Sequence, residues 1–360
     1  MKRNGTTKSG TQRWRCKACG ASASHKYNSD AKQLKAFLKW LFSKDAQADM
    51  KGGGRTFRRM AARFWPIWAL PPIIDEIHDI VYIDGIYITK KLVILIASTD
   101  DFVLGWYLAR SEHSKAWEAL ISRIAPPVIV VTDGAPGFEK ARKKYWPDTD
   151  VQRCTLHAYR QVRRYTTSRP KLPAGVELYG LAQDLKKLKS IKDADEWVAR
   201  YLEWCRRWGE FLEEKTYGEG GHWDYTHWRL RKARASLSRL VSSERLFTYL
   251  TSDLADESLL PSTNNRAESL NAQLRRMLRI HRGMSSMHRV KAAFWWCYMH
   301  TECPASEAEI LKMMPTDEDI NEIYRTMTMQ EQRFDSIPQW GDAIVWSELH
   351  HSDPWRHDWD

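Results

Sequence analysis

Acidic residues are scarce at the start of this chain. The first 72 of its 360 residues contain three Asp or Glu against 16 Lys or Arg. Residues 1–303 contain 52 basic and 32 acidic residues, a net charge of +20, whereas residues 304–360 contain four basic and 13 acidic residues, a net charge of −9. This asymmetry indicates a body that binds a polyanion, followed by an acidic C-terminal tail over residues 304–360.

The chain also lacks any apolar run close to the roughly 20 residues that a membrane-spanning helix needs. It has six cysteines and no visible signal peptide. We therefore expect a cytoplasmic protein with reduced thiols and no membrane partner. No internal repeat is visible, which argues against a solenoid. A chain of this length can bury the cores of two or three domains.

A single Cys-x-x-Cys motif, Cys16 and Cys19, lies in the basic arm of residues 1–29. With the Gly20 that follows, it is half of a zinc ribbon, whose tetrahedral site normally takes a second such pair. His25 is a candidate third ligand, and no fourth is evident. We therefore expect an incomplete Zn²⁺ site. Two free thiols are the alternative, as are a start inside a longer protein, a degenerate ribbon, and ligands from a partner subunit.

Residues 30–72 have a helical pattern. A helix capped by Asp30 is expected over residues 31–43, and a glycine break at residues 51–54 precedes a basic helix over residues 55–65. Two short helices of this kind are typical of a helix-turn-helix, so we expect the region to bind DNA. A solvated basic face is the alternative. The apolar side of the first helix is expected to be Leu34, Phe37, Leu38, Leu41 and Phe42. The side chains expected to face the duplex are Arg55, Arg58, Arg59 and Arg63.

Residues 75–164 show strand and helix patterns in an informative order. Three antiparallel strands are followed by a helix and a further, parallel strand, which is the opening order of a ribonuclease H-like fold. In that order, the first and fourth strands lie side by side. The expected strands cover residues 80–88, 92–98, 102–109, 128–133 and 151–157, and the expected helices cover residues 114–124 and 135–146.

Two of these strands carry an aspartate followed by glycine, Asp84-Gly85 and Asp133-Gly134. An ionised carboxylate buried without a partner costs several kcal/mol, so we expect a cation to meet Asp84. Two strands that each bring an aspartate to one edge of a sheet indicate carboxylates that share a hard divalent cation.

The second half of the chain completes the pattern with helices. Residues 165–262 have no strand signal and predict an all-helical insertion domain. Residues 263–303 complete the core with a helix that starts near Asn264 or Asn265 and carries Glu268 in an early turn. The candidate DNA contacts on this helix are Arg275 and Arg276.

Several motifs together resemble those of bacterial insertion-sequence transposases of the Mutator-like kind, which carry a DDE catalytic triad. The resemblance covers roughly residues 75–300, and the arm around Cys16 is also similar to the end of the zinc ribbon that precedes some of these enzymes. The motifs are Tyr82-Ile83-Asp84-Gly85, Thr132-Asp133-Gly134-Ala135, Cys154-Thr155-Leu156-His157 and Asn264-Asn265-Arg266-Ala267-Glu268-Ser269-Leu270-Asn271.

This resemblance implies an α/β ribonuclease H-like core interrupted by a helical insertion. Asp84, Asp133 and Glu268 would hold two Mg²⁺ or Mn²⁺ ions for strand cleavage at element ends and strand transfer into target DNA. The implied partners are double-stranded DNA, as terminal inverted repeats and target, and further copies of the chain, since two ends must be joined. The implied location is the bacterial cytoplasm, at the nucleoid.

Alternatives stay open at several points. Cys154 and His157, read as lying on one strand, could bind zinc, His157 could contact the scissile phosphate, or the pair could be an ordinary buried thiol and ring. Trp223 could stack on a flipped base or pack in a core. A ribonuclease H-like nuclease or resolvase without strand transfer, or a non-catalytic DNA-binding regulator derived from a transposase, would carry similar motifs.

Overall fold

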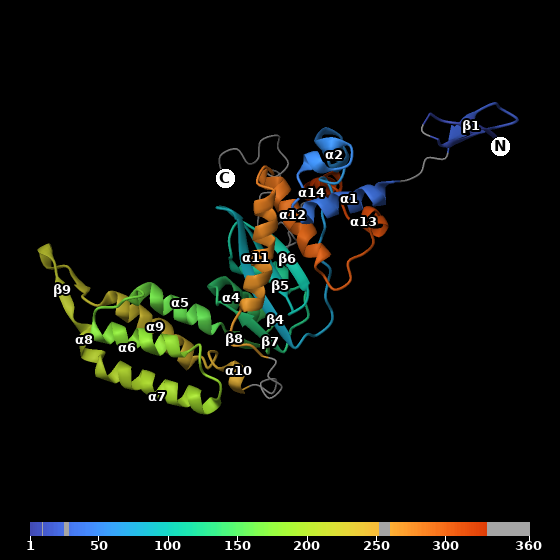
Figure 1. Cartoon of the computed structure of the whole chain (residues 1–360). Helices are drawn as coiled ribbons and strands as arrows, with labels where there is room; N and C mark the ends of the chain where they lie inside the picture. Colours follow the sequence, from blue (N-terminus) through green and yellow to red (C-terminus); the bar gives the residue numbers. More distant parts are fainter. Residues whose placement is uncertain (9, 25–28, 252–259, 330–360) are drawn as a thin grey trace. The chain divides into compact units, whose positions relative to one another are not determined.

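A computed structural model describes residues 1–8, 10–24, 29–251 and 260–329 of the chain (Figure 1). The chain divides into two compact units. The first joins residues 1–69 to residues 305–322, and the second begins at Leu70 and contains the large sheet. The protein is therefore a mixed α/β molecule, as expected, and its first unit combines the N-terminal segment with a segment late in the chain.

The first unit starts with a small antiparallel sheet of three strands in chain order, β1 (Lys2–Thr6), β2 (Gln12–Arg15) and β3 (Ser22–Ser24). The Cys-x-x-Cys motif forms the turn between β2 and β3. The backbone N–H of Cys16 donates to the carbonyl of Ala21 at 2.8 Å, and that of Gly20 donates back to Cys16 at 3.2 Å. Gly20 has a φ of +72°, which favours glycine at this turn.

The two helices expected over residues 30–72 are present with shifted bounds. Helix α1 (Asp30–Phe42) includes Asp30 instead of being capped by it, and α2 (Gly53–Ala61) starts before the expected Arg55. Gly52, with a φ of +85°, turns the chain after the short helix η1 (Gln47–Asp49), so two residues of the glycine run can enter α2.

Helix α1 buries four of its five expected apolar residues. The fifth, Phe42, is 36% exposed, and Trp40 is buried instead. The ring of Trp40 packs edge-on against the ring of Phe57 on α2, with the ring centroids 5.1 Å apart. An aromatic contact between the helices thus extends the buried side of α1 by one position that the apolar pattern did not include.

The described part of the acidic region, expected as a tail, contributes helices α13 (Glu307–Met313) and α14 (Asp317–Met329). The indole N–H of Trp68 donates to a carboxylate oxygen of Asp317 at 2.6 Å, and the backbone N–H of Trp68 donates to Pro315 at 2.8 Å. Residues 305–322 are thus tied to the segment that follows α2.

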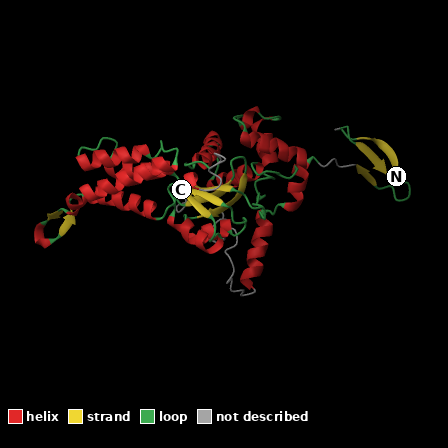
Figure 2. Cartoon of the chain, turned by 90° about the horizontal axis from the view of Figure 1, so that it is seen from below, coloured by secondary structure: helices red, strands yellow, loops and turns green. Residues whose placement is uncertain are grey.

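The second unit is built on a five-stranded mixed sheet, seen as yellow arrows among red helices in Figure 2. The strand order is β6-β5-β4-β7-β8, with the first three antiparallel and the last two parallel to β4. Most of the expected strands are confirmed with small shifts at their ends. The strands are β4 (Ile80–Thr89), β5 (Leu92–Ser98), β6 (Val103–Ala109), β7 (Ile129–Thr132) and β8 (Asp150–Arg153).

Helices cover both faces of this sheet, and alternate residues of its strands face each layer. Val81 and Ile83 join the core formed with α3 (Ser114–Ile121) and α4 (Pro136–Tyr145). Tyr82, between them, packs with Ala267 in a separate cluster. The second layer consists of α11 (Asn265–Ile280) and α12 (Ser286–Met299), whose orange ribbons lie over the strands in Figure 1.

The fifth strand, expected over residues 151–157, is shorter than predicted. Strand β8 ends at Arg153, and residues 155–157 belong to helix α5 (Thr155–Thr166) instead. The hydroxyl and backbone N–H of Thr155 both donate to the carbonyl of Ser262, at 3.1 and 2.9 Å, which fixes the start of α5 near the approach to α11.

The insertion is mainly helical, as expected, and has a core that includes Trp197, Tyr201 and Trp204. It is not all-helical. Strands β9 (Lys215–Tyr217) and β10 (Trp223–Tyr225) form an antiparallel hairpin, because the glycine-rich segment between them allows a tight reversal. The helices are α6 (Pro173–Asp184), α7 (Ile191–Arg207), α8 (Gly209–Glu213), α9 (Trp228–Ser242) and α10 (Thr248–Thr251).

Within the described residues, no helix is both long and apolar enough to cross a membrane.

Candidate active site

Two aspartates lie together on the neighbouring parallel strands β4 and β7, Asp84 in the middle of β4 and Asp133 directly after the end of β7. Tyr82 of β4 pairs with Val131 of β7, and each aspartate lies two residues further along the chain. The side-by-side placement expected for Asp84 and Asp133 is therefore present. Two carboxylates placed this closely repel each other, and Asp133 contributes to raising the pKa of Asp84.

Asp84 accepts hydrogen bonds from two neighbouring groups. One carboxylate oxygen accepts from the side-chain amide of Asn271 on α11 at 2.7 Å, and the other accepts from the backbone N–H of Gly85 at 2.9 Å. Burial raises the pKa of Asp84 most, followed by the charge of Asp133, and these two donors oppose the shift. These two hydrogen bonds thus fix the position of the Asp84 carboxylate.

Asp133 lies at a tight turn between β7 and α4. One of its oxygens accepts from the backbone N–H of Ala135 at 3.3 Å. Gly134 has a φ of +89°, and a side chain there would collide with the guanidinium of Arg153 at the end of β8. Burial lowers the pKa of Arg153, and the charge of Asp133 opposes this shift. The glycine after Asp133 therefore makes room for the partly buried guanidinium of Arg153.

Glu268, the third expected acid, lies in the first turn of α11 and has its own cationic partner. Arg160 of α5 donates to both of its carboxylate oxygens, at 2.7 and 3.4 Å. Nδ1 of His157 lies 3.7 Å from the nearer of these oxygens. The structure therefore brings Asp84 and Asp133 together, while Glu268 is held by an arginine that the sequence analysis did not identify.

Cys154 and His157 form one end of α5, which corrects their assignment to a single strand. Cys154 precedes the helix and His157 lies in its first turn. A hydrogen bond with the Cys154 sulfur raises the pKa of His157 above its ordinary value. Burial alone would raise the pKa of the Cys154 thiol, but hydrogen bonds from His157 and from the backbone N–H of Asn264 lower it. His157 is thus biased toward its cationic form beside Glu268.

Asn264 links this helix start to the sheet. Its backbone N–H donates to the sulfur of Cys154 at 3.2 Å, and its side-chain amide donates to the carbonyl of Ile83, next to Asp84, at 3.0 Å. Asn264 precedes α11 as expected, but its side chain does not cap the helix. One asparagine thereby joins β4, α5 and α11.

A further acid, Glu112, lies close to the aspartates and was missed in the sequence. It is half-buried in the loop between β6 and α3. Burial raises the pKa of Glu112 to about 7, with contributions from Asp133 and Asp84. In the sequence, an acid just before a helix resembles an ordinary helix-start residue, so nothing there distinguished it.

The chemistry of these side chains fits Mg²⁺ or Mn²⁺, which prefer carboxylate and amide oxygens. Asp84 and Asp133 supply such oxygens and repel each other, so a cation between them would relieve the repulsion. The side-chain oxygen of the buried Asn271 has no hydrogen-bond partner in the part of the chain that is described. In that same part, no three His, Cys, Asp or Glu side chains are grouped as a ready-made metal site.

Residues 94–289 match the family described as "Transposase, Mutator family", a range that covers more than half of the chain and includes Asp133 and Glu268. The chain belongs to the Mutator family of transposases. This confirms the family resemblance inferred from the sequence motifs.

Two curated transposases illustrate the relationship to the Mutator family. The chain is 25% identical over 219 residues to the probable transposase for insertion sequence element ISRM3-like of Sinorhizobium fredii (strain NBRC 101917 / NGR234). It is 24% identical over 260 residues to the transposase for insertion sequence element ISRM3 of Rhizobium meliloti (strain 1021). The matches cover 57% and 66% of this chain, and 54% and 64% of the respective relatives.

The basic residues expected to contact DNA lie on the surfaces of both units of this Mutator-family chain. All of them are exposed, and Arg63, which follows α2, also donates to a carboxylate oxygen of Asp30 at 2.8 Å. An ion pair of this kind reduces the charge that Arg63 can offer to a phosphate. The exposed arginines on α2 and α11 are Arg55, Arg58, Arg59, Arg275 and Arg276.

Trp223 lies on β10 of the hairpin and is 39% exposed, so it is not a core residue. The ammonium group of Lys215 on β9 lies 3.9 Å from the centre of its ring. Tyr217, also on β9, is 70% exposed. An exposed aromatic side chain beside a cation is suited to stacking on a nucleic-acid base.

The Cys-x-x-Cys turn supplies two of the four ligands that a structural zinc site takes. The backbone N–H of Cys19 lowers the pKa of Cys16, which favours a thiolate. His25 lies outside the described residues. Two thiols do not complete a tetrahedral site, so zinc binding stays a prediction.

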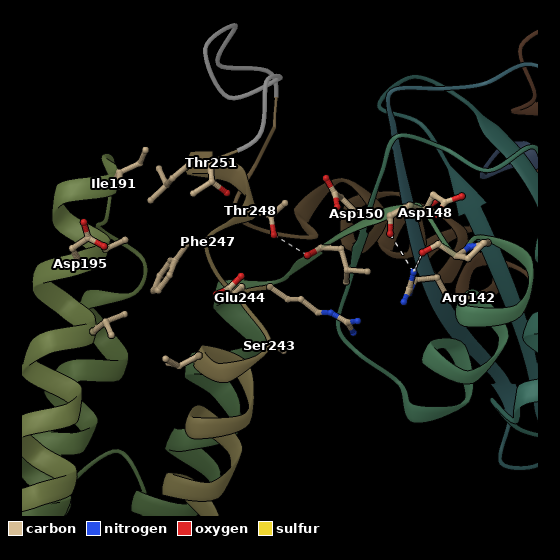
Figure 3. A pocket seen from close by; sticks show the side chains of 18 residues that line it. Arg142, Asp148, Asp150, Ile191, Asp195, Ser243, Glu244, Phe247, Thr248 and Thr251 are labelled. Carbon is tan, nitrogen blue, oxygen red and sulfur yellow. Dashed lines mark hydrogen bonds between the residues drawn. The ribbon is translucent and has the colours of Figure 1, made fainter.

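A cavity of about 930 Å³ has none of these acids in its lining (Figure 3). Ile191 and Asp195 of α7 line it on one side, opposite Phe247 and Thr248. On another side lies Arg142, whose guanidinium donates to the carbonyls of residues 146, 147 and 149 at 3.0 to 3.2 Å. Because the guanidinium of Arg142 already donates to three backbone carbonyls, it stabilises the loop before β8.

Proposed function

We propose that the protein is the transposase of an insertion sequence, which cuts DNA at the ends of its element and joins the freed ends to target DNA. The observation that carries this proposal is the placement of Asp84 beside Asp133 on paired strands, in a chain of the Mutator family. The strand order β6-β5-β4-β7-β8 supports a ribonuclease H-like core.

The reaction consists of two displacements at phosphorus. First, the oxygen of water attacks the scissile phosphodiester, the bond to the 3′ oxygen breaks, and this oxygen takes up a proton to leave as a 3′ hydroxyl. Second, that hydroxyl attacks a phosphodiester of the target, and the target's 3′ oxygen leaves as a hydroxyl in turn. Two Mg²⁺ or Mn²⁺ ions, when bound, favour such displacements by stabilising charge on the attacking and leaving oxygens.

The residues of the chain have distinct tasks in this proposal. Asp84, Asp133 and Glu268 would hold the cations, and the Asn271 amide keeps the Asp84 carboxylate in place. His157, whose pKa is raised by its contact with Cys154, can donate a hydrogen bond to a phosphate oxygen from its place beside Glu268.

DNA binding in this proposal uses the exposed arginines of α2 and α11. The net charge of +20 over residues 1–303 supports contact with a polyanion. Trp223 would stack on an unpaired base near the cleavage point. Since two element ends must be joined, we propose that copies of the chain assemble on DNA.

A cleavage assay on labelled DNA that contains an element end tests the function. The proposal expects a nick with a 3′ hydroxyl in Mg²⁺, no nick in EDTA, and a joined product when target DNA is added. Cleavage without a joined product would favour the nuclease alternative. Specific binding with no cleavage in Mg²⁺ or Mn²⁺ would favour the regulator alternative.

A further inference from the structure

We propose that Glu112 is an additional carboxylate of the cation site that Asp84 and Asp133 form. The proposal rests on the metal-dependent function proposed above. Glu112 comes from a different segment than the three acids of the DDE motif, the loop that joins β6 to α3. Its placement depends on two glycines, Gly85 directly after Asp84 and Gly137 in the first turn of α4.

The first glycine, Gly85, follows Asp84 directly on β4. A methyl group on Gly85 would lie 2.7 Å from one carboxylate oxygen of Glu112 and 2.9 Å from its carboxyl carbon. Real side-chain carbons do not approach other atoms this closely, so the carboxyl group occupies space that exists because residue 85 lacks a side chain. The Glu112 carboxyl therefore lies against the backbone that bears Asp84.

The second glycine, Gly137, lies in the first turn of α4, four residues after Asp133. A methyl group on Gly137 would collide with the backbone carbonyl of Glu112 and lie 3.0 Å from the carbonyl carbon of His113. The loop thus packs directly on the helix that Asp133 precedes. Gly85 accommodates the side chain of Glu112, and Gly137 accommodates its backbone.

Charge supports the same arrangement. The charges of Asp133 and Asp84 both contribute to raising the pKa of Glu112, in agreement with the packing of its carboxyl group against Gly85. In the described residues, no Lys or Arg forms an ion pair with Glu112. Mutual repulsion between Glu112 and the two aspartates costs free energy, because no basic side chain within the described ranges offsets the charge of Glu112. A divalent cation would offset this repulsion.

Asn271 provides an independent sign that a ligand belongs here. It is 1% exposed, and its amide nitrogen donates to Asp84. The oxygen of the same amide has no hydrogen-bond partner in the described part of the chain, although leaving a buried polar atom unpaired costs free energy. A cation beside Asp84 would give this oxygen a partner of the hard kind that amide oxygens bind.

A calorimetric titration of the full chain with Mn²⁺, in the absence of DNA, tests the proposal. The variants are Glu112→Gln, Gly85→Ala and Asp84→Asn, with Glu196→Gln on the exposed side of α7 as the matched control. Gly85→Ala changes no charge but displaces the Glu112 carboxyl, since this is the movable end of a flexible side chain. Thermal unfolding of each variant with and without Mn²⁺ verifies folding and gives a second reading of affinity.

We expect Glu112→Gln and Gly85→Ala each to weaken Mn²⁺ binding by about tenfold or more, the scale on which residues around a metal act. Glu196→Gln should bind as the unchanged protein does. Wild-type Mn²⁺ affinity in both folded Glu112→Gln and folded Gly85→Ala, with binding lost in Asp84→Asn, would overturn the role of Glu112 and leave the proposed function standing. Equal Mn²⁺ affinity in all variants, Asp84→Asn included, would instead contradict the proposed function itself.

Discussion

Arg160 donates to both carboxylate oxygens of Glu268, at 2.7 and 3.4 Å, and thereby neutralises the acid that the sequence motif identifies as the third of the triad. Arg160 lies two helical turns into α5, on the same side as His157, three residues earlier. A Glu268 that binds a cation has to exchange this arginine for the metal. The ion pair therefore competes with metal binding.

Replacing Arg160 by glutamine should strengthen Mn²⁺ binding, because Glu268 is then free to act as a ligand. The pair is partly exposed, so it contributes about 1 kcal/mol or less, which corresponds to roughly a fivefold gain in affinity at most. Calorimetric titration measures this change. Arg164→Gln, an exposed position one turn further along α5, is the control and should have no effect. Weaker Mn²⁺ binding by Arg160→Gln would show that the arginine supports the site instead.

Replacing Asn271 by alanine should destabilise the fold, because Asp84 loses the amide that donates to it at 2.7 Å. Removing a hydrogen bond to a charged, largely buried group costs about 1–3 kcal/mol. Urea unfolding of Asn271→Ala, Asp84→Asn and the double variant measures the coupling between the two side chains. Strictly additive losses of stability in the double variant would mean that the contact contributes nothing.

The stability of the metal-free protein should fall as pH rises from about 4.5 to about 7. Glu112 has an ordinary pKa of 4.5, and in the folded protein burial and the charges of Asp133 and Asp84 raise it to about 7. Between these values, the folded state holds a proton that the unfolded state has released, so raising the pH favours unfolding. Above pH 7 this contribution becomes constant.

Denaturant unfolding in EDTA across this pH range tests the linkage, with Glu112→Gln as the comparison. The variant should show a smaller loss of stability between pH 4.5 and 7, since the amide does not titrate. Superimposable pH profiles for the two proteins would contradict the assigned shift. The half-exposed position of Glu112 allows solvent to screen its charge, which limits the size of the effect.

Strand periodicity made the core of the site predictable. The runs that became β4, β5 and β7 are apolar and β-branched, and an order of three antiparallel strands, helix and parallel strand leaves β4 and β7 as neighbours. The position of Asp84 beside Asp133 follows from that order alone. The bounds of β5, Leu92–Ser98, were predicted to the residue.

Other parts depend on tertiary contacts that the local pattern does not contain. Cys154 and His157 were assigned to a strand over residues 151–157, whereas the hydrogen bonds of Thr155 to Ser262 fix a helix start there. Glu112 and Arg160 are ordinary in sequence, and each gains its role from a segment distant in the chain. The β9–β10 hairpin did have a signal, glycines between aromatic runs, which the reading of a purely helical insertion overlooked.

The most direct test of the central claim, that Asp84 and Asp133 hold catalytic cations, is a change of metal preference on replacing either aspartate by cysteine. Mg²⁺ prefers oxygen ligands, whereas Mn²⁺ accepts sulfur more readily. Cleavage of element-end DNA by Asp84→Cys and Asp133→Cys should be lost in Mg²⁺ and partly restored in Mn²⁺, while Asp84→Ser and Asp133→Ser should remain inactive in both. Unchanged Mg²⁺-dependent cleavage by the cysteine variants would contradict the account.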